Sequence, residues 1–170
     1  AWETLPSIVA HDAATYYSNV CQHKNKEYLR RLVLDDKIAL SLMALIGKAG
    51  DNIGAQRIAI RALQNLLTVS ESCIELCTSV LPTLTHMVRV HHDLGAAQCI
   101  YNISCSQECI SVLKEHGVHV HTLEYYMNTE NLEVRQTYLE IICQMFSDAN
   151  VIDEMLAAGI VEKVSETVTG

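Results

Sequence analysis

Apolar and small residues recur every three or four positions along four long segments of this 170-residue chain: 11–22, 52–68, 92–105 and 131–147. This spacing places the apolar side chains on one face of an α-helix. The composition does little to oppose helix formation, because the chain contains only two prolines and seven glycines. The pattern therefore predicts an all-α protein with four long amphipathic helices.

Shorter amphipathic segments accompany the long ones, and each is divided by residues typical of a corner. Segments 107–127 and 150–168 contain Gly117 and Gly159. Glycine readily adopts the left-handed backbone that ends a helix. Segment 71–88 contains Pro82 instead, and proline fits the first turn of a following helix. Each segment is predicted to form a short helix, a turn and a second helix.

The long segments share one polar position. Residues 58–69 read IAIRALQNLLTV and residues 95–106 read GAAQCIYNISCS, each with an asparagine among small and apolar neighbours. Aligned on this position, the four segments carry Asn19, Asn65, Asn102 and Gln144, at intervals of 46, 37 and about 42 residues. Repeats of about 40 to 47 residues are typical of stacked helical arrays. A single copy could not bury its own apolar face, so the copies are expected to stack.

Three motifs mark the copies: LPxL at a helix start (LPTL at 81–84, echoed by LPSI at 5–8), ALxNL in a long helix (ALQNL at 62–66), and HGV or AGI at a corner. In this combination residues 4–169 resemble the armadillo repeat family. The resemblance implies a right-handed α-α superhelix of about four three-helix repeats. It also implies one domain over residues 1–170, interpreted as a fragment of a longer protein. HEAT repeats, which share the architecture but lack the asparagine, are the alternative. The approximate repeat boundaries are 1–24, 25–70, 71–106, 107–149 and a partial repeat at 150–170.

In the armadillo family the asparagine of the long helix lines a concave groove, where its amide binds the main chain of an extended peptide. The resemblance assigns this role to Asn19, Asn65 and Asn102. A primary amide both donates to and accepts from a peptide group, so it can bind main chain whatever the side chains are. The alternative is that the amide joins one repeat to the next and contacts no ligand.

Positions four and eight residues before the asparagine lie on the same helix face. They are Arg61 and Arg57 in the second long segment, and Gln98 lies four before the asparagine of the third. Two guanidinium groups beside an amide suit an acidic or phosphorylated segment. The alternative is that both arginines pair with acidic residues of adjacent repeats. The predicted partner-binding residues are Asn19, Arg57, Arg61, Asn65, Gln98 and Asn102.

The resemblance also argues against one known role. Nuclear-import receptors of the armadillo family carry a tryptophan four residues before the asparagine, where it forms pockets for lysine side chains. Here the four equivalent positions are Thr15, Arg61, Gln98 and Glu140. A receptor for nuclear localisation signals is therefore not expected.

Charge and cysteine content restrict the partners and the compartment. The formal net charge of −8 and the pI near 5.4 disfavour nucleic-acid and anionic-membrane partners. Seven cysteines cannot all pair within the chain, and they lack the spacing of a disulfide framework. The chain has no purely apolar run of the length that a membrane span needs. A cytoplasmic location is expected, with the nucleus as the alternative.

Candidate chemistry is weak. Cys73 with Cys77, and Cys105 with Cys109, have a spacing that would place two thiols on one helix face, and three histidines lie near Gly117. The sequence contains no CxxC, no HExxH, no glycine-rich phosphate loop and no GxSxG. We therefore expect no metal, no cofactor and no catalytic residue.

These observations favour a non-catalytic interaction module that binds a protein or peptide segment along the face formed by the long helices. The alternative hypothesis is an oligomerisation or autoinhibitory domain of a larger enzyme or cytoskeletal protein, in which self-association would occur.

Overall fold

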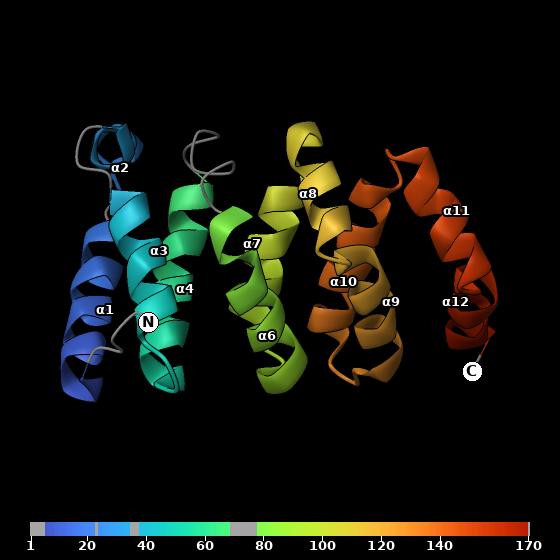
Figure 1. Ribbon diagram of the computed structural model, residues 1–170, viewed down its shortest axis with the longest axis horizontal. Coiled ribbons are helices and arrows are strands. Elements are labelled where there is room, and N and C mark those ends of the chain that lie inside the picture. The colour runs from blue at the N-terminus through green and yellow to red at the C-terminus, as the bar shows by residue number, and fades with distance from the viewer. Residues whose placement is uncertain (1–5, 23, 35–37, 69–77, 170) are drawn as a thin grey trace. The chain divides into compact units, whose positions relative to one another are not determined.

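The computed structural model describes residues 6–22, 24–34, 38–68 and 78–169. All regular secondary structure in these ranges is helical (Figure 1), so the predicted all-α class is confirmed. The chain divides into two compact units, Ala1–Ile103 and Ser104–Gly170. Cys73 and Cys77, which the sequence suggested as thiol neighbours, lie outside the described residues.

The first unit is built around one long helix, α4. This helix packs along α1 and α3, and also contacts α2. Its buried side chains include Ile60, Leu63 and Leu66, which form a core with Leu42 and Ile46 of α3. The helices of the unit are α1 (Ser7–Cys21), α2 (Lys26–Leu34), α3 (Ile38–Lys48), α4 (Ile53–Leu67), α6 (Leu81–His91) and α7 (Leu94–Ser104), with a 3-10 turn, η1 (Thr78–Val80), before α6.

Asn52 determines how α4 begins and where α1 lies beside it. Its side-chain oxygen accepts a hydrogen bond from the backbone N–H of Ala55 at 3.1 Å, which satisfies one of the unpaired donors at the helix start. Its side-chain nitrogen donates to the carbonyl oxygen and to the hydroxyl of Ser7, both at 2.9 Å. One amide therefore fixes the starts of two helices, although Asn52 and Ser7 are 45 residues apart in the sequence.

Small residues allow α7 to approach α4 closely. Ala96 and Ala97 are fully buried, and the thiol of Cys99 donates to the carbonyl oxygen of Ile60 at 3.6 Å. A Cβ at Gly95 would lie 3.6 Å from the Cγ2 of Ile60. The apolar stripe that the sequence pattern predicted for residues 92–105 therefore packs against its counterpart in residues 52–68.

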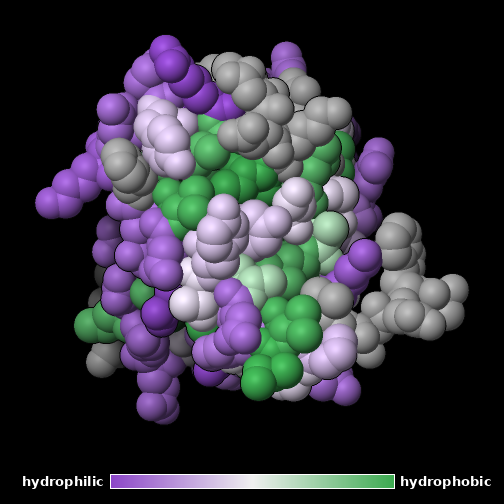
Figure 2. All heavy atoms as spheres, turned by 90° about the vertical axis from the view of Figure 1, so that its left-hand side faces the viewer, coloured by the Kyte–Doolittle hydropathy of each residue, from purple (hydrophilic) through white to green (hydrophobic). Residues whose placement is uncertain are grey.

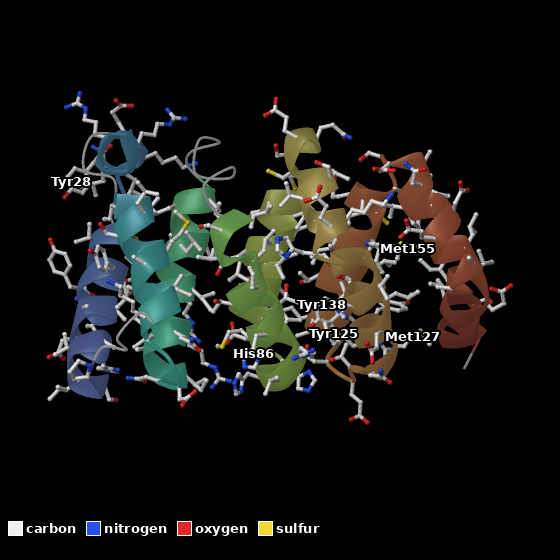
Figure 3. The ribbon with its side chains drawn as sticks, viewed as in Figure 1. Tyr28, His86, Tyr125, Met127, Tyr138 and Met155 are labelled. Carbon is white, nitrogen blue, oxygen red and sulfur yellow. The ribbon has the colours of Figure 1, made fainter. Side chains whose placement is uncertain are left out.

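The second unit repeats the order of short and long helices. Its largest contact is between α9 and α10, where the rings of Tyr125 and Tyr138 lie 5.8 Å apart (Figure 3). Its elements are a 3-10 turn, η2 (Gln107–Cys109), then α8 (Ile110–Glu115), α9 (Val118–Asn128), α10 (Leu132–Met145), α11 (Ala149–Ala157) and α12 (Ile160–Thr169).

Two glycines form the corners of the second unit. Gly117 separates α8 from α9 with a φ of +65°, and Gly159 separates α11 from α12 with a φ of +76°. Residues with a Cβ rarely adopt this left-handed backbone. Both corners predicted from the sequence are therefore confirmed, as is the position of Pro82 in the first turn of α6.

A buried histidine joins three helices of the second unit. The Nε2 atom of His119, on α9, lies 2.7 Å from a carboxylate oxygen of Glu154, on α11. The amino group of Lys114, on α8, lies 3.4 Å from the other oxygen of that carboxylate. The hydrogen bond from His119 holds the pKa of Glu154 below its ordinary value, and Lys114 adds to the effect. The carboxylate is therefore held as the anion between two donors.

Candidate functional site

Seven residues of the first unit line a hollow of about 310 Å³ between the C-terminal end of α1, the middle of α4 and the start of α7. Most of them carry amide or guanidinium groups, so we call this surface the polar hollow. It brings together three predicted binding residues, Arg61, Asn65 and Gln98. The complete lining is Gln22, Arg61, Gln64, Asn65, Leu94, Gly95 and Gln98.

Helix geometry explains why α4 supplies so much of this lining. Arg61 and Asn65 are four residues apart and lie on one face of the helix. Gln64 is beside them and donates a hydrogen bond from its side-chain nitrogen to the side-chain oxygen of Gln98 on α7. This amide pair holds the two helices together at the base of the hollow and leaves the second hydrogen of the Gln64 amide for another acceptor.

Arg57, one turn before Arg61, has a different environment. Its Nε atom lies 3.1 Å from a carboxylate oxygen of Asp93, and its side chain also reaches the carbonyl oxygen of His91 at 3.5 Å. The other oxygen of Asp93 accepts from the backbone N–H of Ala96 at the start of α7. Arg57 is therefore the arginine that pairs with an acidic residue of the adjacent segment, and it does not line the hollow.

Arg61 is available for a ligand. Within the described parts of the chain its guanidinium has no carboxylate at ion-pair distance, and its side chain is exposed. A guanidinium group offers five N–H donors in a fixed plane, which suits a carboxylate or phosphate. Four amide groups surround it, and each can pair with a peptide unit.

The three asparagines of the shared position are not equivalent. Asn65 lines the polar hollow, whereas Asn19 is exposed on α1 and Asn102 is half-buried in α7, both outside the lining. Over the ranges that the structure describes, none of the three side-chain amides is hydrogen-bonded to another protein group. The bonds between α4 and α7 come instead from Gln64, Arg57 and Cys99.

Two lining residues with amide side chains were not predicted from the sequence. Gln22 follows the last residue of α1, and Gln64 precedes Asn65. Gln64 did carry a signal, because it is a polar residue between the apolar Leu63 and the predicted Asn65. Gln22 carried none, since it lies at a helix end, where polar residues are ordinary.

No family model, no curated protein and no solved structure matches this chain.

The cysteines and histidines that the sequence suggested as metal ligands do not come together in the described part of the chain. Its histidine, cysteine and acidic side chains form no group of three that could hold a metal ion. Cys109 is buried at the end of η2 and Cys105 is exposed, whereas His119 contacts Glu154. None of the described helices is long and apolar enough to cross a membrane.

Proposed function

We propose that this chain is a non-catalytic protein-interaction module of the armadillo type, in which the helices form a right-handed superhelix and the polar hollow binds an extended acidic segment of a partner. The resemblance in motif order and the succession of helices support the architecture. The cysteine-rich composition favours a reducing compartment, the cytoplasm or the nucleus.

One observation carries the binding proposal: Arg61, Asn65 and Gln98 come from two helices that are joined in the first unit, and they meet in one hollow. The amide of Asn65 and the side-chain N–H groups of Gln98 can pair with the main chain of the ligand, and Arg61 can pair with a carboxylate or phosphate side chain. The ligand is therefore an extended segment with an acidic or phosphorylated residue, bound by its backbone on both sides of the acidic group.

Fluorescence anisotropy with short unstructured peptides tests this proposal. The peptides have a serine-rich background and carry glutamate, phosphoserine or lysine at the centre. Glutamate and phosphoserine peptides should bind, more tightly at low ionic strength, and lysine peptides should not. Arg61→Glu should weaken binding by about tenfold or more, since it removes a charge-assisted hydrogen bond and adds a repulsion. Asn65→Ala should have a smaller effect, about threefold, because it removes a neutral hydrogen bond.

Arg89→Glu is the matched control. Arg89 is an exposed arginine on α6 outside the hollow, so this substitution changes the net charge by the same amount. Binding by this variant should stay within about twofold of the wild type, as expected when a distant charge is screened by salt. Equal losses in the two variants would show that only the overall charge matters, and the hollow would then have no specific role.

A further inference from the structure

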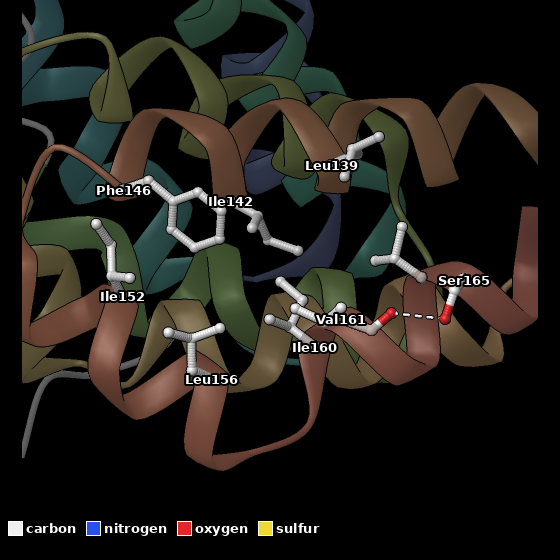
Figure 4. Close-up of a pocket in the computed structure, with 9 residues that line it drawn as sticks. Leu139, Ile142, Phe146, Ile152, Leu156, Ile160, Val161 and Ser165 are labelled. Carbon is white, nitrogen blue, oxygen red and sulfur yellow. Dashed lines mark hydrogen bonds between the residues drawn. The ribbon is translucent and has the colours of Figure 1, made fainter.

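An apolar groove lies between α10, α11 and α12 in the second unit (Figure 4). Its volume is about 560 Å³. Ser165 is its polar member, and the Ser165 hydroxyl oxygen lies 2.8 Å from the carbonyl oxygens of Val161 and Glu162, so it is already paired. The apolar side chains of its lining include Leu139, Phe146, Leu156 and Val161. We call this surface the α10–α12 groove.

The first unit shows what kind of element fits such a groove. There, α1 is followed by α2 and α3, and the long helix α4 packs against all three. In the second unit, α10 is followed in the same way by α11 and α12. Aligned on Asn19 and Gln144, Leu139 and Phe146 occupy the positions of Ala14 and Cys21. Ala14 and Cys21 are buried where α1 packs against α4, whereas Leu139 and Phe146 remain partly exposed.

The chain also carries a helix that matches α4 and has an uncovered face. Aligned on Asn19 and Asn65, the residues Val9, Ala13, Tyr16 and Val20 of α1 correspond to Ala55, Ala59, Ala62 and Leu66 of α4. The four α4 residues are fully buried. Their α1 counterparts, which we call the α1 stripe, are partly exposed, with Val9 at 47% and Tyr16 at 64%. Figure 2 shows apolar side chains gathered on this end of the first unit, with hydrophilic residues around them.

Charge favours contact between the first unit of one copy and the second unit of another. Residues 104–170 contain eleven acidic and three basic residues, which accounts for the whole net charge of −8. Residues 1–103 contain nine of each sign. Several of the basic ones are exposed on or beside α2 in the first unit: Lys24, Lys26, Arg30 and Arg31. Arg30 and Arg31 both pair with Glu27 on the same helix, and the first unit carries no excess charge of either sign. Two acidic second units would therefore repel each other, whereas a second unit and a first unit would not.

We propose that the α10–α12 groove of one molecule binds the α1 stripe of a second copy of this chain. The contact is head-to-tail, because it joins two different surfaces. Every complex of this kind still has one open groove at one end and one open stripe at the other. Assembly should therefore continue beyond the dimer as concentration rises. This inference is independent of the polar hollow, so Arg61→Glu should leave assembly unchanged.

Sedimentation velocity across a dilution series from micromolar to submillimolar concentration tests the proposal on the whole chain. The weight-average mass of the wild type should rise past that of a dimer. Val9→Glu blocks the stripe and Leu156→Glu blocks the groove, and each variant alone should stay monomeric, with association weakened at least tenfold. Both positions are about half exposed, so the fold should tolerate glutamate there, and circular dichroism checks the helix content.

An equimolar mixture of the two variants gives the decisive result. Val9→Glu keeps an intact groove and Leu156→Glu keeps an intact stripe, so the mixture should form a dimer and nothing larger. Val90→Glu, the same substitution at a residue of α6 that is 49% exposed, should assemble like the wild type. Val161→Glu provides a second groove variant if Leu156→Glu loses helix content. A wild type that stays monomeric throughout, or a mixture that stays monomeric while the wild type assembles, would overturn the proposal.

Discussion

Two arginines one helical turn apart on α4 show how far the environment decides what a residue can do. Arg57 is held by Asp93, and its charge is already matched. Arg61 lines the polar hollow beside Asn65. Both have the same residue type, the same helix face and similar exposure, so only their neighbours distinguish them. The binding proposal therefore depends on Arg61, and Arg57 helps to fix the start of α7.

Removing the amide of Asn52 should lower the free energy of unfolding by about 1 to 2 kcal/mol, because it leaves the start of α4 without its cap. The bonds to Ser7 would be lost as well. Urea denaturation of Asn52→Ala, followed by circular dichroism, measures this loss. Asp51→Ala alters the exposed neighbour and should change stability by less than about 0.5 kcal/mol. If the two variants are equally stable, the amide does not anchor α4.

The contact of Glu154 with His119 and Lys114 should make the second unit sensitive to acid. The pKa of Glu154 is lowered in the folded state, so the carboxylate stabilises the fold fully above its unfolded value of about 4.5. This stabilisation is lost as the pH falls through the lower, folded-state pKa. Thermal unfolding should therefore show a destabilising effect of Glu154→Gln at pH 7 that shrinks towards pH 3. Glu162→Gln, an exposed control, should have little effect at either pH. A constant difference between wild type and Glu154→Gln would contradict this assignment.

Several residue contacts could not be predicted from the sequence. Arg57 and Asp93 are 36 residues apart, and Gln64 and Gln98 are 34 apart. Each pairing depends on the distance and rotation of α7 relative to α4, which small residues such as Ala96 set through packing. From the sequence, either arginine could pair with an acidic residue or bind a ligand. Only the positions of the helices show that Arg57 pairs with Asp93 and that Arg61 lines the hollow.

At the scale of the element, the sequence predicted the long helices well. The predicted segments 52–68 and 131–147 correspond to α4, Ile53–Leu67, and α10, Leu132–Met145. Hydrophobic periodicity over several turns is a strong signal because it reflects one buried face. The end of α6 was not predicted: His92 takes a left-handed backbone with a φ of 48°, a conformation more typical of glycine. The sequence gives no clear sign of a helix end where a residue other than glycine takes the left-handed backbone.

Two glycine-to-alanine substitutions should have opposite effects on stability. Gly117→Ala should lower the free energy of unfolding by about 1 kcal/mol, because alanine is strained at a φ of +65°. The space itself is open, since the added Cβ would only reach His121 at 3.7 Å. Gly47→Ala, in the last turn of α3, should instead raise it by about 0.5 kcal/mol, because the Cβ meets nothing within 4 Å and alanine favours the helix. Urea denaturation of both variants checks the signs, and two losses of similar size would contradict the assigned corner.

At the scale of the whole molecule, composition and periodicity were enough to predict the all-α class, and a helix succession consistent with repeats appears in both units. The superhelix stays a prediction, because handedness arises from small rotations between successive repeats. Those rotations depend on side-chain packing across many contacts, which no single motif encodes. The α10–α12 groove could not be predicted from the sequence either, because it depends on how three helices pack.

The concentration of acidic residues in positions 104–170 has a practical consequence for experiments. An amine-coated sensor chip or an anion-exchange bead attracts the carboxylate-rich half and has little attraction for the balanced half. Adsorbed molecules should therefore attach mainly through the second unit. Electrostatic immobilisation would thus hold the protein through residues that do not line the polar hollow, without a tag or a chemical cross-link.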